Sequence, residues 1–161
     1  LLQRLLQARP DDSSIFPVRH DRYGIPDAPR GPFVAVGNER EILELPPLTY
    51  RVAGLNLPVA GGGYFRLFPL RVMRAGLRQA AGTPAGPAVA VLYFHPWEFD
   101  PDQPRLPLGR LARWRTYVGT GRTTARLGEL LGGYRFTRAI DAVRAIRAAG
   151  AELPRFRVAG V

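Results

Sequence analysis

A run of six apolar residues at 89–94, Val-Ala-Val-Leu-Tyr-Phe, constrains the fold of this chain more than any other segment. An unbroken run of β-branched, aliphatic and aromatic side chains, with Gly86 and Pro87 before it, predicts a strand buried on both faces. Pro96 restricts the residue before it to extended backbone and has no N–H for a ladder, so the strand is predicted to end at His95. Ligands of α/β sheets and barrels bind at the carboxyl ends of strands, which makes His95 a candidate for chemistry. A histidine satisfied by a backbone carbonyl at a strand end fits the same pattern.

The rest of the chain alternates between helical and strand-like patterns. Besides 89–94, strands are expected at 41–45, 49–52 and 156–158. Apolar residues at helical spacing predict helices at 67–81, 120–131 and 137–149. A stretch rich in proline and glycine at 19–32 predicts a long irregular loop, and its charged and aromatic residues favour a functional role. This order of elements predicts an α/β fold class.

The strong positive charge does not by itself predict nucleic-acid binding. The formal net charge is +10, but all 23 basic residues are arginine and they are dispersed along the chain. This pattern indicates a compositional bias, because single-strand binders interleave their basic residues with an aromatic platform. No nucleic-acid partner is therefore expected. No apolar run approaches the length of a transmembrane helix, so no membrane span is expected either.

Several kinds of catalytic or metal site are disfavoured by residue content. The chain has no cysteine, which excludes disulfides, thiolate metal sites and cysteine nucleophiles. The only serines, at positions 13 and 14, lack a Gly-x-Ser-x-Gly elbow around them. The two histidines, His20 and His95, are far apart in sequence and form no His-x-x-x-His pair. No metal site is expected from this chain alone.

Glu98 and Asp100 are the carboxylates nearest to His95 in the sequence. In an extended segment they would lie on the same face, like the two catalytic carboxylates of a glycosidase. Their side chains would then lie too close together to flank a glycosidic bond, which needs about 5 Å or more between the two groups. A helix cap or a salt bridge to a neighbouring arginine is the favoured interpretation.

Three segments, at 12–26, 57–66 and 92–101, together resemble a known family. In this order they resemble the C-terminal half of polysaccharide deacetylases of the NodB-homology type. The nearest subgroup is the bacterial one found with exopolysaccharide and exosortase loci, including its C-terminal associated region. The resemblance covers about residues 10–136 and implies the C-terminal portion of a distorted (β/α) barrel.

This resemblance also implies a division of the chain into domains. Residues 1–136 are expected to form the barrel portion, with an inserted loop and strands at about 19–66, and 137–161 to form a C-terminal helix and tail. The opening residues 1–8 look like the last turns of an amphipathic helix without a cap. We therefore expect the sequence to begin inside a larger fold.

The resemblance assigns the proton-transfer chemistry to His95. Residues 92–95 match the family's last motif, whose histidine is the general acid that protonates the leaving amine. An imidazole near a carboxylate titrates around neutral pH, where such an acid is most useful. An earlier motif supplies an aspartate that tunes this histidine, and Asp12 is the best match, with Asp21 second.

The resemblance further implies a substrate-binding rim. Trp97 and Tyr64 suit such a rim because aromatic faces stack on pyranose rings, although two half-buried structural aromatics fit the sequence equally well. His20 and Asp21, in the irregular loop, are also expected at the substrate. The expected partner is an N-acetylated polysaccharide.

The family motifs that bind metal and supply the catalytic base do not occur in this sequence. A metal-activated water requires those ligands, so this chain alone is expected to be inactive and to bind no cofactor. A divalent metal, expected to be zinc, would belong to the full-length protein, with the missing N-terminal half as partner. A non-catalytic carbohydrate-binding or polysaccharide-assembly module is the alternative, and an arginine-rich nucleic-acid binder is a weaker third.

Overall fold

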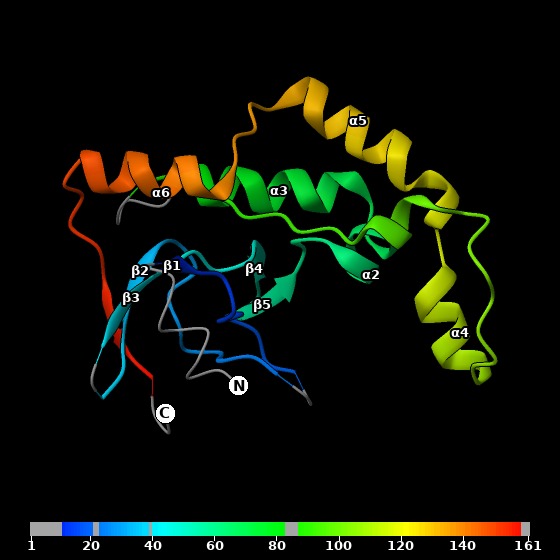
Figure 1. The fold of residues 1–161 in the computed structure, drawn as a ribbon, viewed down its shortest axis with the longest axis horizontal. Coiled ribbons are helices and arrows are strands. Elements are labelled where there is room, and N and C mark those ends of the chain that lie inside the picture. The colour runs from blue at the N-terminus through cyan, green and yellow to red at the C-terminus, as the bar shows by residue number, and fades with distance from the viewer. Residues whose placement is uncertain (1–10, 21–22, 39, 83–86, 159–161) are drawn as a thin grey trace.

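The protein has a mixed α/β fold in the computed structural model, which describes residues 11–20, 23–38, 40–82 and 87–158 (Figure 1). The strands are β1 (Asp11–Asp12), β2 (Phe33–Val36), β3 (Glu41–Glu44), β4 (Thr49–Val52), β5 (Leu55–Pro58) and β6 (Arg155–Arg157). The α-helices are α2 (Gly62–Leu67), α3 (Leu70–Ala81), α4 (Arg110–Tyr117), α5 (Thr123–Gly133) and α6 (Ala139–Ala148). Two short 3-10 helices are η1 (Pro96–Phe99) and η2 (Thr120–Arg122). The predicted α/β class is confirmed at this general level.

The strands form two small sheets rather than a closed barrel within the described residues. The larger sheet has the order β1-β3-β2-β6, with β2 and β3 antiparallel and the two outer strands parallel to their neighbours. The second sheet is the β4-β5 hairpin. Its tight turn at Ala53 and Gly54 has positive φ at both residues, which matches the twist of antiparallel strands. The predicted strands at 41–45 and 49–52 are thus confirmed as β3 and β4.

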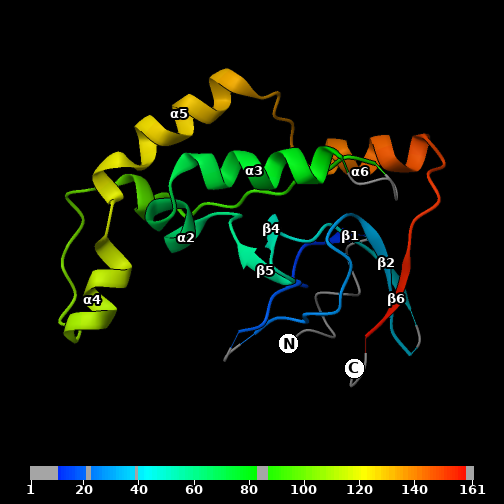
Figure 2. The ribbon, with the colours of Figure 1, turned by 180° about the vertical axis from the view of Figure 1, so that it is seen from behind.

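Helices α3 and α6 lie along one side of the two sheets, and α5 lies beyond α3 (Figures 1 and 2). The largest core contains Leu48, which directly precedes β4, and Val59, which directly follows β5. These two residues pack with Phe65, Met73 and Leu130 of α2, α3 and α5. Met73 is fully buried, as the helical spacing at 67–81 predicts, although a break at Phe68 and Pro69 separates α2 from α3. Because Pro69 has no N–H, it suits the start of a new helix rather than the interior of a longer one.

The last helix and strand close the other end of the molecule. Val143 and Ile146 of α6 are buried against Leu43 and Leu45. Strand β6 pairs with β2 in parallel register, which confirms the strand expected near 156–158. Helix α6 and strand β6, in the segment expected to form a C-terminal helix and tail, thus pack on the four-stranded sheet.

The prediction of a doubly buried strand at 89–94 is wrong. This segment is extended but makes only two isolated parallel bridges, Val91 to Pro47 and Tyr93 to Gly61. Its side chains are half-buried or exposed. The bridges join it to the chain just before β4 and just after β5, where Pro47 has no N–H to donate and Gly61 leads into α2. A ladder cannot propagate from either point, so the apolar run ends as an irregular extended segment.

Two further expectations are limited by what the structure describes. The helix-like opening at 1–8 and the candidate Asp21 lie outside the described residues. Among the described residues, none of the helices has both the length and the apolar character needed to cross a bilayer.

Candidate functional site

The site is built on a buried ion pair between Arg66 of α2 and Glu98 of η1. The guanidinium Nε lies 3.4 Å from the carboxylate Oε2, and the side chains are 1% and 0% exposed. Neither of these two atoms has another protein hydrogen-bond partner. Each charge therefore depends on the other, because an unpaired buried charge has a large desolvation penalty.

The remaining polar atoms of the pair hold backbone from two other segments. The Arg66 Nη1 donates to the carbonyls of Thr116 and Val118, at 2.7 and 3.1 Å. The Glu98 Oε1 accepts the backbone N–H of His95 at 3.1 Å. Burial lowers the pKa of Arg66, and the neighbouring carboxylate of Glu98 opposes that shift. The pair thus joins α2, the His95 loop and the end of α4.

The His95 loop is shaped by residues on both sides of the histidine. His95 is the N-cap of η1, Pro96 takes the first helical position, and Glu98 returns to the N-cap N–H. Upstream, the N–H of Tyr93 donates to the carbonyl of Ala60 at 3.0 Å. A Cβ on Gly61 would lie only 1.7 Å from the Tyr93 carbonyl oxygen, so glycine is required for this approach.

Three aromatic rings, from Tyr93, His95 and Trp97, form a surface over the ion pair that we call the aromatic rim. Tyr93 and Trp97 are 36% and 39% exposed, and His95 is also exposed. The rings of His95 and Trp97 are stacked at 8° with centroids 5.9 Å apart, and Tyr93 meets His95 edge-on. The guanidinium carbon of Arg66 lies 5.1 Å from the Trp97 ring centroid. A cation stacked beneath an exposed ring fixes that ring in place.

Tyr64 joins this group at its inner edge. Burial raises the pKa of Tyr93, and the carboxylate of Glu98 and the hydroxyl of Tyr64 add to the effect. Tyr64 also stacks on Phe68, with centroids 6.1 Å apart. The structure therefore brings the predicted site residues His95, Trp97 and Tyr64 into one neighbourhood.

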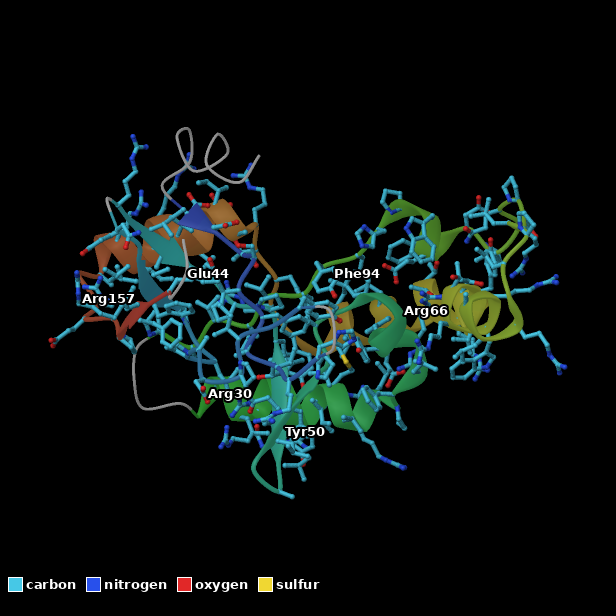
Figure 3. All side chains as sticks on the ribbon, turned by 90° about the horizontal axis from the view of Figure 1, so that it is seen from below. Arg30, Glu44, Tyr50, Arg66, Phe94 and Arg157 are labelled. Atoms are coloured by element: carbon cyan, nitrogen blue, oxygen red, sulfur yellow. The ribbon has the colours of Figure 1, made fainter. Side chains whose placement is uncertain are left out.

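Asp12 lies elsewhere, beside Glu44 in the four-stranded sheet. The two residues are paired in the β1-β3 register, and Asp12 accepts the hydroxyl of Ser14 at 2.7 Å. Figure 3 shows Glu44 well apart from Phe94, the residue next to His95, and from Arg66. The carboxylate that the structure places beside the His95 loop is Glu98. Asp12 matches a family motif, but similarity of motifs gives no information on the distance between two residues in the fold.

His20 also lies in a different setting from the aromatic rim. Its ring stacks on Tyr23, with centroids 4.0 Å apart, and Tyr23 in turn stacks on Phe16 of the main core. These contacts anchor the start of the irregular loop at 19–32. The structure gives no contact between His20 and the aromatic rim among the described residues.

The sequence analysis did not single out Arg66, Tyr93 or Glu44. The interpretation of Glu98 as a cap or salt-bridge partner is confirmed, but one arginine among 23 could not be chosen as its partner. Glu44 alternates with apolar residues, a pattern typical of a half-buried strand whose polar side chains face solvent. Glu44 is instead 1% exposed, and its Oε1 accepts the N–H of Ile15 at 2.8 Å. Burial raises the pKa of Glu44 to about 7, and the charge of Asp12 adds to this.

The aromatic rim is exposed, and it holds no metal-binding cluster among the described residues. Among the described residues, no three His, Asp or Glu side chains are grouped so as to bind a metal ion. A hollow of about 380 Å³ lies elsewhere, lined mainly by apolar residues of α3, α6, 88–92 and 134–137. The aromatic rim is therefore an open surface, suited to an extended ligand rather than an engulfed one.

A family profile described as domain of unknown function (DUF3473) matches residues 13–144, a span that includes the ion pair and the whole aromatic rim. No curated protein and no solved structure showed significant similarity to the chain. Because the profile covers most of the sequence, the chain belongs to the DUF3473 family.

Proposed function

We propose that this chain is the C-terminal part of a metal-dependent polysaccharide N-deacetylase, in which it supplies the proton donor and part of the sugar-binding surface. The observation that carries the proposal is the placement of His95. It is exposed within the segment that resembles the deacetylases' last motif, and its loop is held by the buried carboxylate of Glu98.

In this proposal the chain's own residues act after water has attacked the N-acetyl carbonyl. Protonated His95 donates its proton to the amide nitrogen as the C–N bond breaks, so that the sugar leaves as a neutral amine. The Arg66–Glu98 pair fixes the backbone of the histidine, and the adjacent Trp97 restricts the ring by stacking. A preset donor lowers the entropy that must be lost in the transition state.

The proposal does not assign the divalent metal implied by the resemblance to residues of this chain. The described residues do not group three suitable ligands, and the nearest carboxylate to His95 is committed to Arg66. In the proposal, the water-activating metal and its ligands belong to the preceding part of the full-length protein, whose motifs this sequence does not contain. The substrate is an N-acetylated polysaccharide that runs across the aromatic rim.

The test compares His95→Ala with the parent in the full-length protein, using steady-state deacetylation of N-acetylglucosamine oligomers. We expect kcat to fall by about 100-fold or more with little change in KM, because the proton transfer occurs only in the transition state. Glu152→Ala, on the exposed segment between α6 and β6, is the control and should behave as the parent. Unchanged kcat in His95→Ala would remove the histidine from the mechanism.

The alternative is a non-catalytic carbohydrate-binding module, which the exposure of Tyr93 and Trp97 favours. Such a module would bind glycan through stacking alone. Titration of the same oligomers separates the two functions. If Trp97→Ala weakens binding while the full-length protein shows no turnover that depends on His95, the binding module is the better account.

A further inference from the structure

The segment leading into and through α4 carries an apolar surface that does not pack against the rest of the molecule. Four large apolar side chains lie there, and none belongs to a core cluster of the described residues. They are Leu106, Leu108, Leu111 and Trp114, which are 58%, 36%, 61% and 53% exposed. We call these four residues the α4 patch. Several exposed large apolar side chains so close together in the sequence indicate a surface that contacts something else.

Helix α4 contacts the molecule through its C-terminal end and is exposed along the rest of its length. Tyr117 is buried and Thr116 is half-buried, so the side of α4 that bears them faces the molecule. At 100° per residue, Leu111 lies about 120° around the helix from Tyr117, Trp114 lies between the two, and both are exposed. The apolar residues therefore point outward.

The patch is displayed on a fixed support. Arg66 holds the C-terminal end of α4 through the carbonyls of Thr116 and Val118. The hydroxyl of Tyr117 accepts the backbone N–H of Leu106 at 2.9 Å, and Arg105 lies over the Tyr117 ring at 4.3 Å. Figures 1 and 2 show α4 at the end of the molecule away from the four-stranded sheet.

The charge around the patch restricts what can cover it. Six arginines and no acidic residue lie between Asp102 and Glu129 in the sequence. A second copy of the chain would bring like charges together on a protein whose net charge is already +10, so self-association is opposed. The occupant should be both apolar and anionic.

We propose that the α4 patch docks on the surface of an anionic phospholipid bilayer. Leucine side chains would enter the acyl boundary, Trp114 would sit at the headgroup level, and the flanking arginines would contact lipid phosphates. A protruding helix suits a flat surface, whereas a protein partner would need an apolar groove with an acidic edge. No described helix is long enough to span the bilayer, so the contact is peripheral. This inference is independent of the proposed deacetylase function.

Vesicle co-sedimentation tests the proposal. The chain should bind vesicles of phosphatidylcholine mixed with phosphatidylglycerol, and should bind phosphatidylcholine vesicles much more weakly. The double variant Leu111→Ser/Trp114→Ser should bind the anionic vesicles at least about 10-fold more weakly, because two apolar side chains are lost from the interface. Leu131→Ser/Phe136→Ser, at residues of similar exposure elsewhere, should bind as the parent.

Tryptophan fluorescence distinguishes lipid from other occupants. The chain has two tryptophans, so Trp97→Phe leaves Trp114 as the only one, and its emission should shift to the blue when anionic vesicles are added. If the double variant binds anionic vesicles as the parent does, or if the parent binds polyglutamate equally well, the contact depends on charge alone. Either result would overturn the proposal. An oligomer that the parent chain forms and the double variant does not form would also overturn it. Strong protection of Trp114 from acrylamide in the vesicle-free full-length protein would instead assign the patch to a protein contact.

Discussion

At the scale of single residues, two buried carboxylates differ in how their charge is compensated. Glu98 faces the guanidinium of Arg66, with Oε2 3.4 Å from Nε. Glu44 forms no ion pair with an arginine of the described residues, and it accepts the backbone N–H of Ile15 beside the acidic Asp12. The first arrangement makes stability depend on a partner, and the second makes it depend on pH.

Removing one member of the Arg66–Glu98 pair should strongly destabilise the fold. We expect Glu98→Ala to lower the free energy of unfolding by about 3–5 kcal/mol, because Arg66 would be left buried and unpaired. Urea denaturation measures the change. The double variant Arg66→Met/Glu98→Leu is the matched comparison and should recover part of the loss, since it leaves no buried charge. A loss in Glu98→Ala below about 1 kcal/mol, typical of an exposed pair, would contradict this picture.

The raised pKa of Glu44 predicts a specific pH dependence of stability. The ordinary pKa of glutamate is 4.5, and that of folded Glu44 is about 7. At a pH between these two values, folded Glu44 retains a proton that the unfolded chain releases. Stability from this group is therefore fully present below about pH 4.5 and declines as pH rises to 7, by up to about 3 kcal/mol. Unfolding midpoints at pH 5 and pH 8 should differ less in Glu44→Gln than in the parent. Glu152→Gln should retain the parent's dependence; an identical dependence in Glu44→Gln would refute the assignment.

At the scale of elements, the extended segment before η1 depends on its close approach to the start of α2. The carbonyl of Tyr93 occupies the space that a Cβ on Gly61 would fill, and the neighbouring N–H of Tyr93 bonds to Ala60. This backbone contact positions the aromatic rim on α2. Replacement of the glycine therefore disturbs both the fold and the candidate site.

Two glycine-to-alanine variants should have opposite effects. Gly61→Ala should destabilise the protein by about 2 kcal/mol or more, because the new methyl group meets backbone that cannot rotate away. Gly128→Ala, in the interior of α5 with open space around it, should stabilise by up to about 1 kcal/mol. Thermal unfolding followed by circular dichroism compares them. Equal, small effects would show that the contact at Gly61 is absent in solution.

At the scale of the whole molecule, the C-terminal helix and strand belong to the same packed unit as the four-stranded sheet. α6 buries Val143 and Ile146 against β3 and the residue after it, and β6 forms one edge of the sheet beside β2. Phe156 of β6 also meets Phe33 edge-on, with centroids 5.8 Å apart. Figure 3 shows Arg66, which packs beneath the ring of Trp97, well apart from Arg157 of β6.

Truncation tests this unity. A chain ending at residue 136 should lose its cooperative thermal transition, because an edge of β2 and the apolar face of Leu43 and Leu45 would both be exposed. Val143→Ala in the full chain is a milder probe and should lower the unfolding free energy by about 1–3 kcal/mol. A truncated chain that unfolds with the parent's cooperativity would show that residues 137–161 form a separate unit.

The sequence alone determined the elements whose signals are local. The helical spacing around Met73, the strand patterns at 41–45 and 49–52, and the capping role of Glu98 all depend on residues a few positions apart, and the structure contains each of them. Tertiary structure decided the pairing of Arg66 with Glu98, the separation of Asp12 from His95, and the failure of 89–94 to become a strand. These depend on which distant segments meet, and a ladder or an ion pair requires a partner that the pattern of one segment does not specify.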